Sequence, residues 1–456
     1  MIKLQIKTKN TDSLDFVFKP VRKTILKTDF FEFNNYEWIN APDPYYEECE
    51  LYENNNYVGD CKVKVRGNYT TVFRKKSLKI KFLDSKNIAG LHDGNKYKKW
   101  NLIAAYKDVS FLRDYLGLKI YSKLFPEKYV SDVCLIDLTI NDKRFGTYIL
   151  EEEQSIKRIT KDLNHKNFLL EYSTYKPNNK YYFYIEDKNK TILDIDNKKI
   201  IYNKNYIVKN KLNDEDKKFI SEYMRNIYDK IYNLIYHHKY YENDKLIIDG
   251  NISDEMMENY IRSLIDLDSL IDIYIFNEII VNPDIYISNF FMWLNYDKGY
   301  PILTFGAPFD LDSSMGFNNF CVAEKSNNKI IGKKESFVNR CLTSQTRYGE
   351  KLYANPWLTI FCHESWFKKL LKERWNKFNL DEVKNFINIE LNKFLTSDYQ
   401  ESFEFTRKKF GIYGDLEICS YAHLSAKKSQ IDAMNYLKNW LIERIDNVDN
   451  LMKNLI

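Results

Sequence analysis

Several features that would identify common functional classes are absent from this chain of 456 residues. Lys and Arg number 69 against 64 Asp and Glu, so the net charge is only +5, without the basic excess expected of a nucleic-acid-binding protein. No stretch approaches the roughly 20 apolar residues of a membrane-spanning helix. The N-terminal segment MIKLQIKTKNTDSLDF also lacks the apolar run of a signal peptide. These absences predict a cytoplasmic protein whose partners include neither nucleic acid nor a membrane.

Motifs of several enzyme classes are missing as well. The six His include no H-x-x-x-H or H-E-x-x-H pair, and the sequence contains no G-x-S-x-G, no Walker motif and no G-x-G-x-x-G loop. The Cys count is odd and no pair has C-x-x-C spacing, which predicts reduced thiols and argues against a zinc site or a disulfide framework. These seven are Cys49, Cys61, Cys134, Cys321, Cys341, Cys362 and Cys419.

The pattern of apolar residues divides the chain into two parts. Residues 1–155 show two-residue alternation in MIKLQIKT, CKVKVRGNYT and SLKIKF, then a helical pattern in SFLRDYLGLKIYSKLF, then two strands joined by the turn NDK. Residues 156–456 are mainly helical, with an irregular, insertion-like segment at 172–250 and a hairpin within 283–312. This order predicts an α+β protein with a β-rich first lobe, a helical second lobe and a ligand cleft between them.

The hairpin region contains the polar pattern that points most clearly to chemistry. Asp284 follows a largely apolar helix in PDIYISNFF, Asn289 comes five residues later, and Asp310 and Asp312 follow the hairpin in FDLD. An extended FDLD would direct both carboxylates to one side, as a Mg²⁺ or Mn²⁺ site requires. The D-x-x-x-x-N spacing before a hairpin and a further Asp is the layout of protein kinases. There the first Asp accepts the proton of the attacking hydroxyl, while the Asn and the later Asp hold metal ions.

Candidates for a phosphate-binding cation come from the first lobe. Lys76 comes just before the strand SLKIKF and shares the parity of its apolar residues, which face the helix. Lys79 and Lys81 point the other way, toward solvent. Lys75 is a neighbouring candidate because strand ends are uncertain by a residue. Arg66, in the turn VRGNYT, fits a position close to a bound cofactor.

The chain resembles the spore-coat CotH kinase family, which has an atypical protein-kinase-like fold. The resemblance rests on blocks that run in the family's order from about residue 60 to the C-terminus, interrupted by 172–250. These blocks are VKVRGNYTTVFRKKSLKIKF, WNLIAAYKDVSFLRDYLGLKIY, INDKRFGTYILEEE, DIYISNFFMWLNYD, FGAPFDLDSSMG and LKNWLIERIDNVDNLM.

Carried over residue by residue, the resemblance implies Asp284 as the catalytic aspartate, Asn289 and Asp310 as metal ligands, and Lys76 as the phosphate-facing lysine. Asp312 and Glu152 match further family positions, and we assign Asp312 to the metal and Glu152 to the cofactor. Asp108 and Arg113 also match, and an ion pair between them would fix the start of the helix. The family's catalytic loop often carries basic or polar residues between the Asp and the Asn; here they are Ile285, Tyr286, Ile287 and Ser288, so no cation neighbours the base in sequence.

The sequence thus predicts an ATP- and Mg²⁺-dependent kinase (Mn²⁺ as an alternative metal), with a two-lobed kinase-like fold and a hydroxyl acceptor on a protein Ser or Thr. Phosphorylation of a small molecule or glycan is an alternative acceptor class. Two further readings stay open: the same fold could catalyse nucleotidyl transfer or ATP-dependent ligation, or serve as a pseudokinase scaffold. The mass of a product distinguishes phosphoryl from nucleotidyl transfer.

Overall fold

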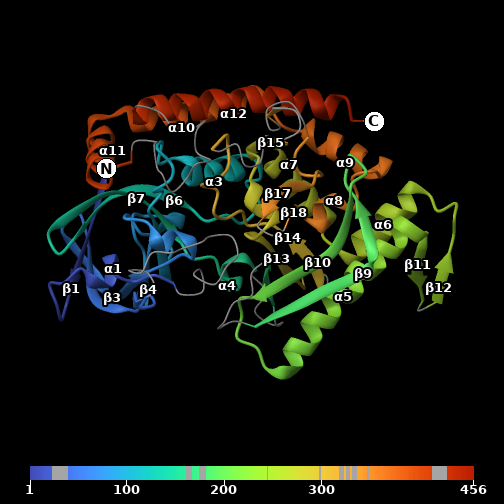
Figure 1. Ribbon diagram of the computed structural model, residues 1–456, viewed down its shortest axis with the longest axis horizontal. Coiled ribbons are helices and arrows are strands. Elements are labelled where there is room, and N and C mark those ends of the chain that lie inside the picture. Colours follow the sequence, from blue (N-terminus) through green and yellow to red (C-terminus); the bar gives the residue numbers. More distant parts are fainter. Residues whose placement is uncertain are drawn as a thin grey trace.

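The computed structural model describes residues 1–22, 40–160, 167–173, 181–243, 245–296, 299–317, 323–324, 329–330, 336–346, 349–412 and 429–455. The chain forms a β-rich N-terminal region and a mainly helical C-terminal region, which is an α+β architecture (Figure 1). No helix in these ranges is both long and apolar enough to cross a membrane. Cys321 and Cys419 lie outside the described residues, and the other five cysteines are free thiols.

The N-terminal region is a closed barrel, which the sequence pattern did not predict. Its strands run in the order β1-β2-β3-β4-β5-β7-β6, and β1 closes the barrel by pairing in parallel with β6 and antiparallel with β2. Alternation places apolar side chains such as Val63 and Ile80 inside, fully buried, while the intervening residues face outward. The strands are β1 (Ile2–Thr8), β2 (Glu47–Glu53), β3 (Asn56–Val65), β4 (Leu78–Lys86), β5 (Tyr97–Ile103), β6 (Val133–Ile140) and β7 (Lys143–Glu152).

Short elements connect these strands. The turn that the sequence predicted between β6 and β7 is confirmed. Asn141 and Asp142 both adopt positive φ there, as a tight hairpin turn requires. At Gly67, φ is +109° and a Cβ would lie 2.0 Å from Thr70 Oγ1, so this turn after β3 needs glycine. The connecting elements are α1 (Asp15–Phe18), η2 (Tyr69–Val72), η3 (His92–Gly94) and α3 (Arg113–Leu124).

The C-terminal region contains a second sheet of order β14-β13-β8-β10-β9. Its hairpin β13–β14 follows Asp284, and β8 pairs with both β13 and β10. The strands β9 and β10 of the insertion-like segment therefore extend the sheet that carries the β13–β14 hairpin, whereas the rest of its described residues lie mainly in a helix and a separate two-stranded sheet. The strands are β8 (Leu169–Ser173), β9 (Tyr182–Leu193), β10 (Lys199–Val208), β13 (Phe290–Asn295) and β14 (Ile302–Phe305). Smaller pairs are β11 (Lys239–Glu242) with β12 (Lys245–Ile248), β15 (Ala323–Glu324) with β16 (Lys329–Ile330), and β17 (Leu342–Thr346) with β18 (Gly349–Tyr353).

Helices complete this region, and α12 runs along one side of the molecule past both regions (Figure 1). The helix α7 is buried on almost every side, as its largely apolar sequence predicts. Its buried Glu278 is paired with Arg444 of α12. The helices are α4 (Ile156–Ile159), α5 (Asp214–His237), α6 (Asp254–Leu264), α7 (Leu267–Ile280), η4 (Pro283–Tyr286), α8 (Pro356–Thr359), α9 (Ser365–Trp375), α10 (Leu380–Asn392), η5 (Lys393–Leu395), α11 (Ser397–Phe410) and α12 (Gln430–Lys453).

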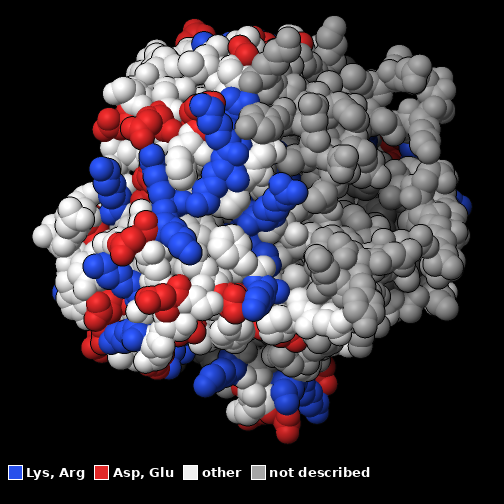
Figure 2. Space-filling view, turned by 60° about the vertical axis from the view of Figure 1, so that its left-hand side comes forward, with Lys and Arg blue, Asp and Glu red and all other residues white. Residues whose placement is uncertain are grey.

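Charge of both signs is distributed over the described surface in Figure 2. Lys and Arg side chains gather toward the middle of this view, with Asp and Glu side chains among and around them. This mixture agrees with the small net charge of +5.

Candidate active site

The loop after α7 fixes the backbone of Asp284. Val281 ends the helix in the left-handed conformation, and the side chain of Asn282 accepts a hydrogen bond from the Asp284 N–H at 3.1 Å. The N–H groups of Ile287 and Ser288 then donate to the Asp284 carbonyl at 2.9 and 2.7 Å. Both the N–H and the carbonyl of Asp284 are hydrogen-bonded, so the backbone that carries its carboxylate is held in one position.

Two residues of this loop anchor it to the rest of the protein. Ile285 and Tyr286 are buried, and the Tyr286 hydroxyl donates to the Phe337 carbonyl at 2.6 Å. The amide of Asn355 donates to the Ile285 carbonyl at 3.1 Å. These contacts attach the loop to the core of the C-terminal region.

The two ends of the β13–β14 hairpin bring Asn289 and Asp310 together. The Asn289 Nδ2 donates to Asp310 Oδ2 at 3.3 Å, across the base of the hairpin. Both residues have positive φ, 61° for Asn289 and 57° for Asp310, a conformation that is strained for residues other than glycine and is common at functional sites. The expectation that FDLD is extended is therefore wrong: local turns, not strand alternation, bring Asp310 and Asp312 into one cluster.

Electrostatic repulsion within this cluster is strong. Burial, followed by the charges of Asp310 and Asp312, raises the pKa of Asp284 to about 7. Asp310 is exposed at the surface, yet partial desolvation by the surrounding protein and the neighbouring Asp312 raise its pKa to about 6. Burial and the same two aspartates hold the pKa of Asp114, on α3, well above its usual range. We refer to these four aspartates as the acid cluster.

A loop from the N-terminal region supplies a cation to this cluster. Lys107 Nζ lies 3.3 Å from Asp312 Oδ2, and its charge opposes the rise in the pKa of both Asp284 and Asp310. Asp114 Oδ1 accepts the Leu311 N–H at 2.5 Å, whereas its Oδ2 is buried without a hydrogen-bond partner.

The predicted ion pair at the start of α3 is confirmed. Asp108 and Arg113 are both almost fully buried and form a short contact. The Asp108 carboxylate also accepts from the N–H groups of Ser110 and Leu112, both at 3.0 Å. The Arg113 Nε donates to the Ser314 carbonyl at 3.1 Å, which joins this loop to the segment after Asp312.

The barrel presents its outer face to the acid cluster. Cross-strand neighbours Lys64, Lys79, Asn101 and Glu151 form a polar strip over β3, β4, β5 and β7. Arg66, at the end of this strip, stacks over the Phe309 ring with 5.5 Å to its centroid, and its charge lowers the pKa of Asp310.

Three members of the polar strip have a shifted pKa, and that of Lys64 is lowered, mainly by burial. Burial raises the pKa of Glu151 to about 7, against the opposing effects of Arg66 and Asn101. Burial lowers the pKa of Lys79, with Arg66 acting in the same direction and the ion pair with Glu153 acting against it.

The prediction for the lysines is corrected. Lys76 does not face the strip or the acid cluster: its ammonium donates to the carbonyls of Phe18 and Pro20 at 2.7 and 2.6 Å. Lys75 is buried against the carbonyls of Ala104 and Thr147. Because β4 begins at Leu78, strand alternation does not extend back to either residue. Lys79, expected in solvent, is only 18% exposed.

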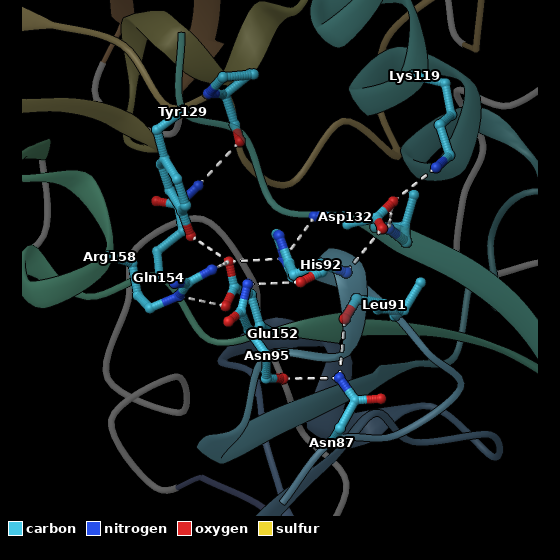
Figure 3. A network of polar contacts seen from close by, with 12 residues as sticks. Asn87, Leu91, His92, Asn95, Lys119, Tyr129, Asp132, Glu152, Gln154 and Arg158 are labelled. Carbon is cyan, nitrogen blue, oxygen red and sulfur yellow. Dashed lines mark hydrogen bonds and ion pairs between the residues drawn. The ribbon is translucent and has the colours of Figure 1, made fainter. Parts of the chain in front are cut away.

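Glu152 is also placed differently from the expectation. Its carboxylate accepts from the Tyr129 hydroxyl at 2.6 Å and from Arg158 Nε at 2.6 Å, and lies 2.8 Å from His92 Nε2 (Figure 3). The neighbouring Glu151 occupies the outer face instead, because successive strand residues point to opposite sides. Gln154 then donates to the carbonyls of residues 307 and 308 and connects the two regions.

The residues expected to hold Mg²⁺ fit a metal that is shared with phosphates. In the described ranges no three Asp, Glu, His or Cys side chains converge closely enough to enclose an ion. Mg²⁺ bound with a nucleotide needs only one or two carboxylates, because phosphate oxygens and water complete its coordination. Asp310, Asp312 and the amide oxygen of Asn289 offer such a set, and the raised pKa values in the cluster indicate negative charge that a cation would neutralise.

Sequence reasoning missed Lys107, Asp114 and Glu151. The first two lie in the stretch YKDVSFLRDYLG, whose pattern indicates a helix and an Asp108–Arg113 pair but does not indicate that either residue contacts the segment of Asp312. The run of three glutamates at residues 151–153 alone could not decide which of them face outward.

A family model described as CotH kinase protein matches residues 63–448. No curated protein matches the chain. The matched residues include β4, α3, the β6–β7 hairpin, the loop of Asp284 and the segment of Asp310, which are the elements that assemble the site. Because this match covers most of the sequence, the chain belongs to the CotH kinase family.

Proposed function

We propose that this protein is an ATP- and Mg²⁺-dependent kinase that transfers the γ-phosphoryl group to a hydroxyl acceptor. The observation that supports this most directly is the convergence of Asp284, Asn289, Asp310 and Asp312 at the base of one hairpin. In a two-lobed, kinase-like arrangement, the acid cluster forms one wall of the nucleotide site and the polar strip forms the other. The closed barrel is an unusual form of the first lobe.

Each proposed role follows from position. Asp284 accepts the proton of the acceptor hydroxyl, whose oxygen forms a bond to the γ-phosphorus while the bond to the β-phosphate oxygen breaks. That bond's electron pair remains on the departing ADP. Asn289, Asp310 and Asp312 hold Mg²⁺, which neutralises phosphate charge when bound. Arg66 faces the nucleotide phosphates.

Lys79 replaces Lys76 as the lysine that we assign to the nucleotide phosphates. It lies on the polar strip with Arg66 and is paired with Glu153, whereas the ammonium of Lys76 is occupied by backbone carbonyls. A protein Ser or Thr hydroxyl is the acceptor that we propose to test first.

The decisive experiment is mass spectrometry of products formed from ATP, MgCl₂ and candidate acceptors, including the protein itself. A product heavier by one phosphoryl group supports the kinase; a nucleotide adduct would instead support nucleotidyl transfer. Asp284→Asn should abolish the product. The matched control is Asp60→Asn, an aspartate on the barrel paired with Lys9 at 2.7 Å, which should leave the yield unchanged. Absence of any adduct and of ATP turnover by the wild type would refute the proposal.

A further inference from the structure

Lys107 is the basic side chain whose charge acts on three members of the acid cluster. Its ammonium lies 3.3 and 3.5 Å from the two carboxylate oxygens of Asp312. Its charge also acts on Asp284 and Asp310. Arg66, by comparison, acts on Asp310 and Glu151 from the barrel side. The two cations therefore approach the cluster from different segments, and the charge of Lys107 acts on Asp284 as well as on Asp310.

The position of Lys107 is fixed by the buried residues next to it. Asp108 binds Arg113 and three backbone N–H groups of its own loop. Arg113 binds the Ser314 carbonyl, two residues after Asp312. The loop that carries Lys107 and the segment that carries Asp312 are thus attached through one buried arginine. The ammonium also lies 5.5 Å from the centroid of the Phe317 ring. These buried contacts hold Lys107 in one position, which an ordinary ion pair on the surface does not require.

The catalytic loop lacks a cation of its own, because Ile285 and Tyr286 are used as buried anchors. Phosphoryl transfer depends on neutralising the charge of the group in transit, and little else is required of the protein. We propose that Lys107 is a further catalytic residue, which donates hydrogen bonds to the transferred phosphoryl group beside Asp284. This inference rests on the proposed kinase function.

The roles of neighbouring groups follow. Lys107 acts only as a hydrogen-bond donor, and Asp284 receives the proton of the acceptor hydroxyl. Asp312 would hold the ammonium in place through its two carboxylate oxygens. Because the contact strengthens as charge develops on the phosphoryl oxygens, Lys107 contributes to the transition state more than to nucleotide binding.

The test compares Lys107→Met and Lys107→Arg with the wild type. The first readout is γ-phosphoryl transfer from labelled ATP to water and to the protein itself. The second is affinity for ADP with Mg²⁺, with and without aluminium fluoride, which mimics the phosphoryl group in transit. Lys119→Met is the matched control, since Lys119 forms a lysine–aspartate pair of 2.7 Å with Asp132, outside the acid cluster.

We expect Lys107→Met to reduce kcat about 100-fold or more, as for the loss of one donor to a developing oxyanion. Affinity for ADP alone should stay within a few-fold, whereas affinity with aluminium fluoride should fall in parallel with kcat. Lys107→Arg should recover most of both losses.

Two outcomes would overturn the inference while the kinase function stands: a Lys107→Met enzyme with normal kcat, or equal losses of both affinities together with a lowered melting temperature. The latter would make Lys107 a structural partner of Asp312. A wild type that shows no transfer at all would refute the proposed function, and this inference with it.

Discussion

Replacing Asp284 with asparagine should stabilise the metal-free protein above pH 7 while it removes the proposed general base. Burial, with Asp310 and Asp312 nearby, raises the pKa of Asp284 from 3.8 to about 7. Between these pH values the folded protein holds a proton that the unfolded chain has released. The free energy of unfolding therefore falls as the pH rises from about 4 to about 7, and then levels off. Asparagine carries no charge and avoids this loss.

The size of the effect follows from the same difference in pKa. At about 1.4 kcal/mol per pH unit, a shift of this size corresponds to roughly 4 kcal/mol. Asp284 keeps partial contact with solvent, so we expect screening to reduce the gain to roughly 2 kcal/mol at pH 8. At pH 4 the two proteins should be equally stable. Added Mg²⁺ and ATP should narrow the difference at pH 8, because they stabilise the wild type through its carboxylates.

Urea denaturation in EDTA, at intervals from pH 4 to pH 8, measures this effect. The control is Asp60→Asn: the ion pair with Lys9 lowers the pKa of Asp60, so its replacement should give a small change of opposite sign. If Asp284→Asn were less stable at every pH, Asp284 would be a turn residue and the reasoning from charge repulsion would be refuted. The variant's transfer activity, measured on the same preparation, should fall about 100-fold or more.

Three further changes separate the roles of other residues. Asp310→Ala should abolish Mg²⁺-dependent ATP binding or leave ATP bound without turnover, and unchanged titration calorimetry with normal turnover would contradict the metal assignment. Lys79→Met should reduce turnover and ATP affinity more than Lys76→Met, which should mainly lower the melting temperature; steady-state kinetics that show the reverse order would return Lys76 to the site. Arg113→Met should destabilise the protein by about 3–5 kcal/mol, because it leaves the buried Asp108 carboxylate without its cation, and a thermal melt within one or two degrees of the wild type would contradict this.

Local patterns predicted much of the fold and part of the site. The β6–β7 hairpin, the helix α3 and the hairpin after Asp284 could be predicted because each depends on neighbouring residues in the sequence. Asp284, Asn289, Asp310 and Asp312 could be grouped for the same reason, although the backbone at Asp310 is a turn where an extended strand was expected.

The remaining features depend on contacts between distant segments. Barrel closure requires β1 to pair with β6, more than 100 residues away, and no local pattern encodes that pairing. Lys107 reaches Asp312 only because α3 packs against the segment after the hairpin. The predictions for Lys76 and Glu152 each failed on one local detail: the residue at which β4 begins, and the side of β7 that faces the acid cluster.

The closed barrel also determines how the chain tolerates shortening. The strand β1 is hydrogen-bonded on both sides, so deleting residues 1–8 would create two unpaired edges at once, one on β2 and one on β6. Exposed strand edges are templates for association between molecules. A chain shortened in this way would retain every residue of the candidate site and still form insoluble assemblies. Loss of activity in such a variant would therefore report on aggregation and not on chemistry.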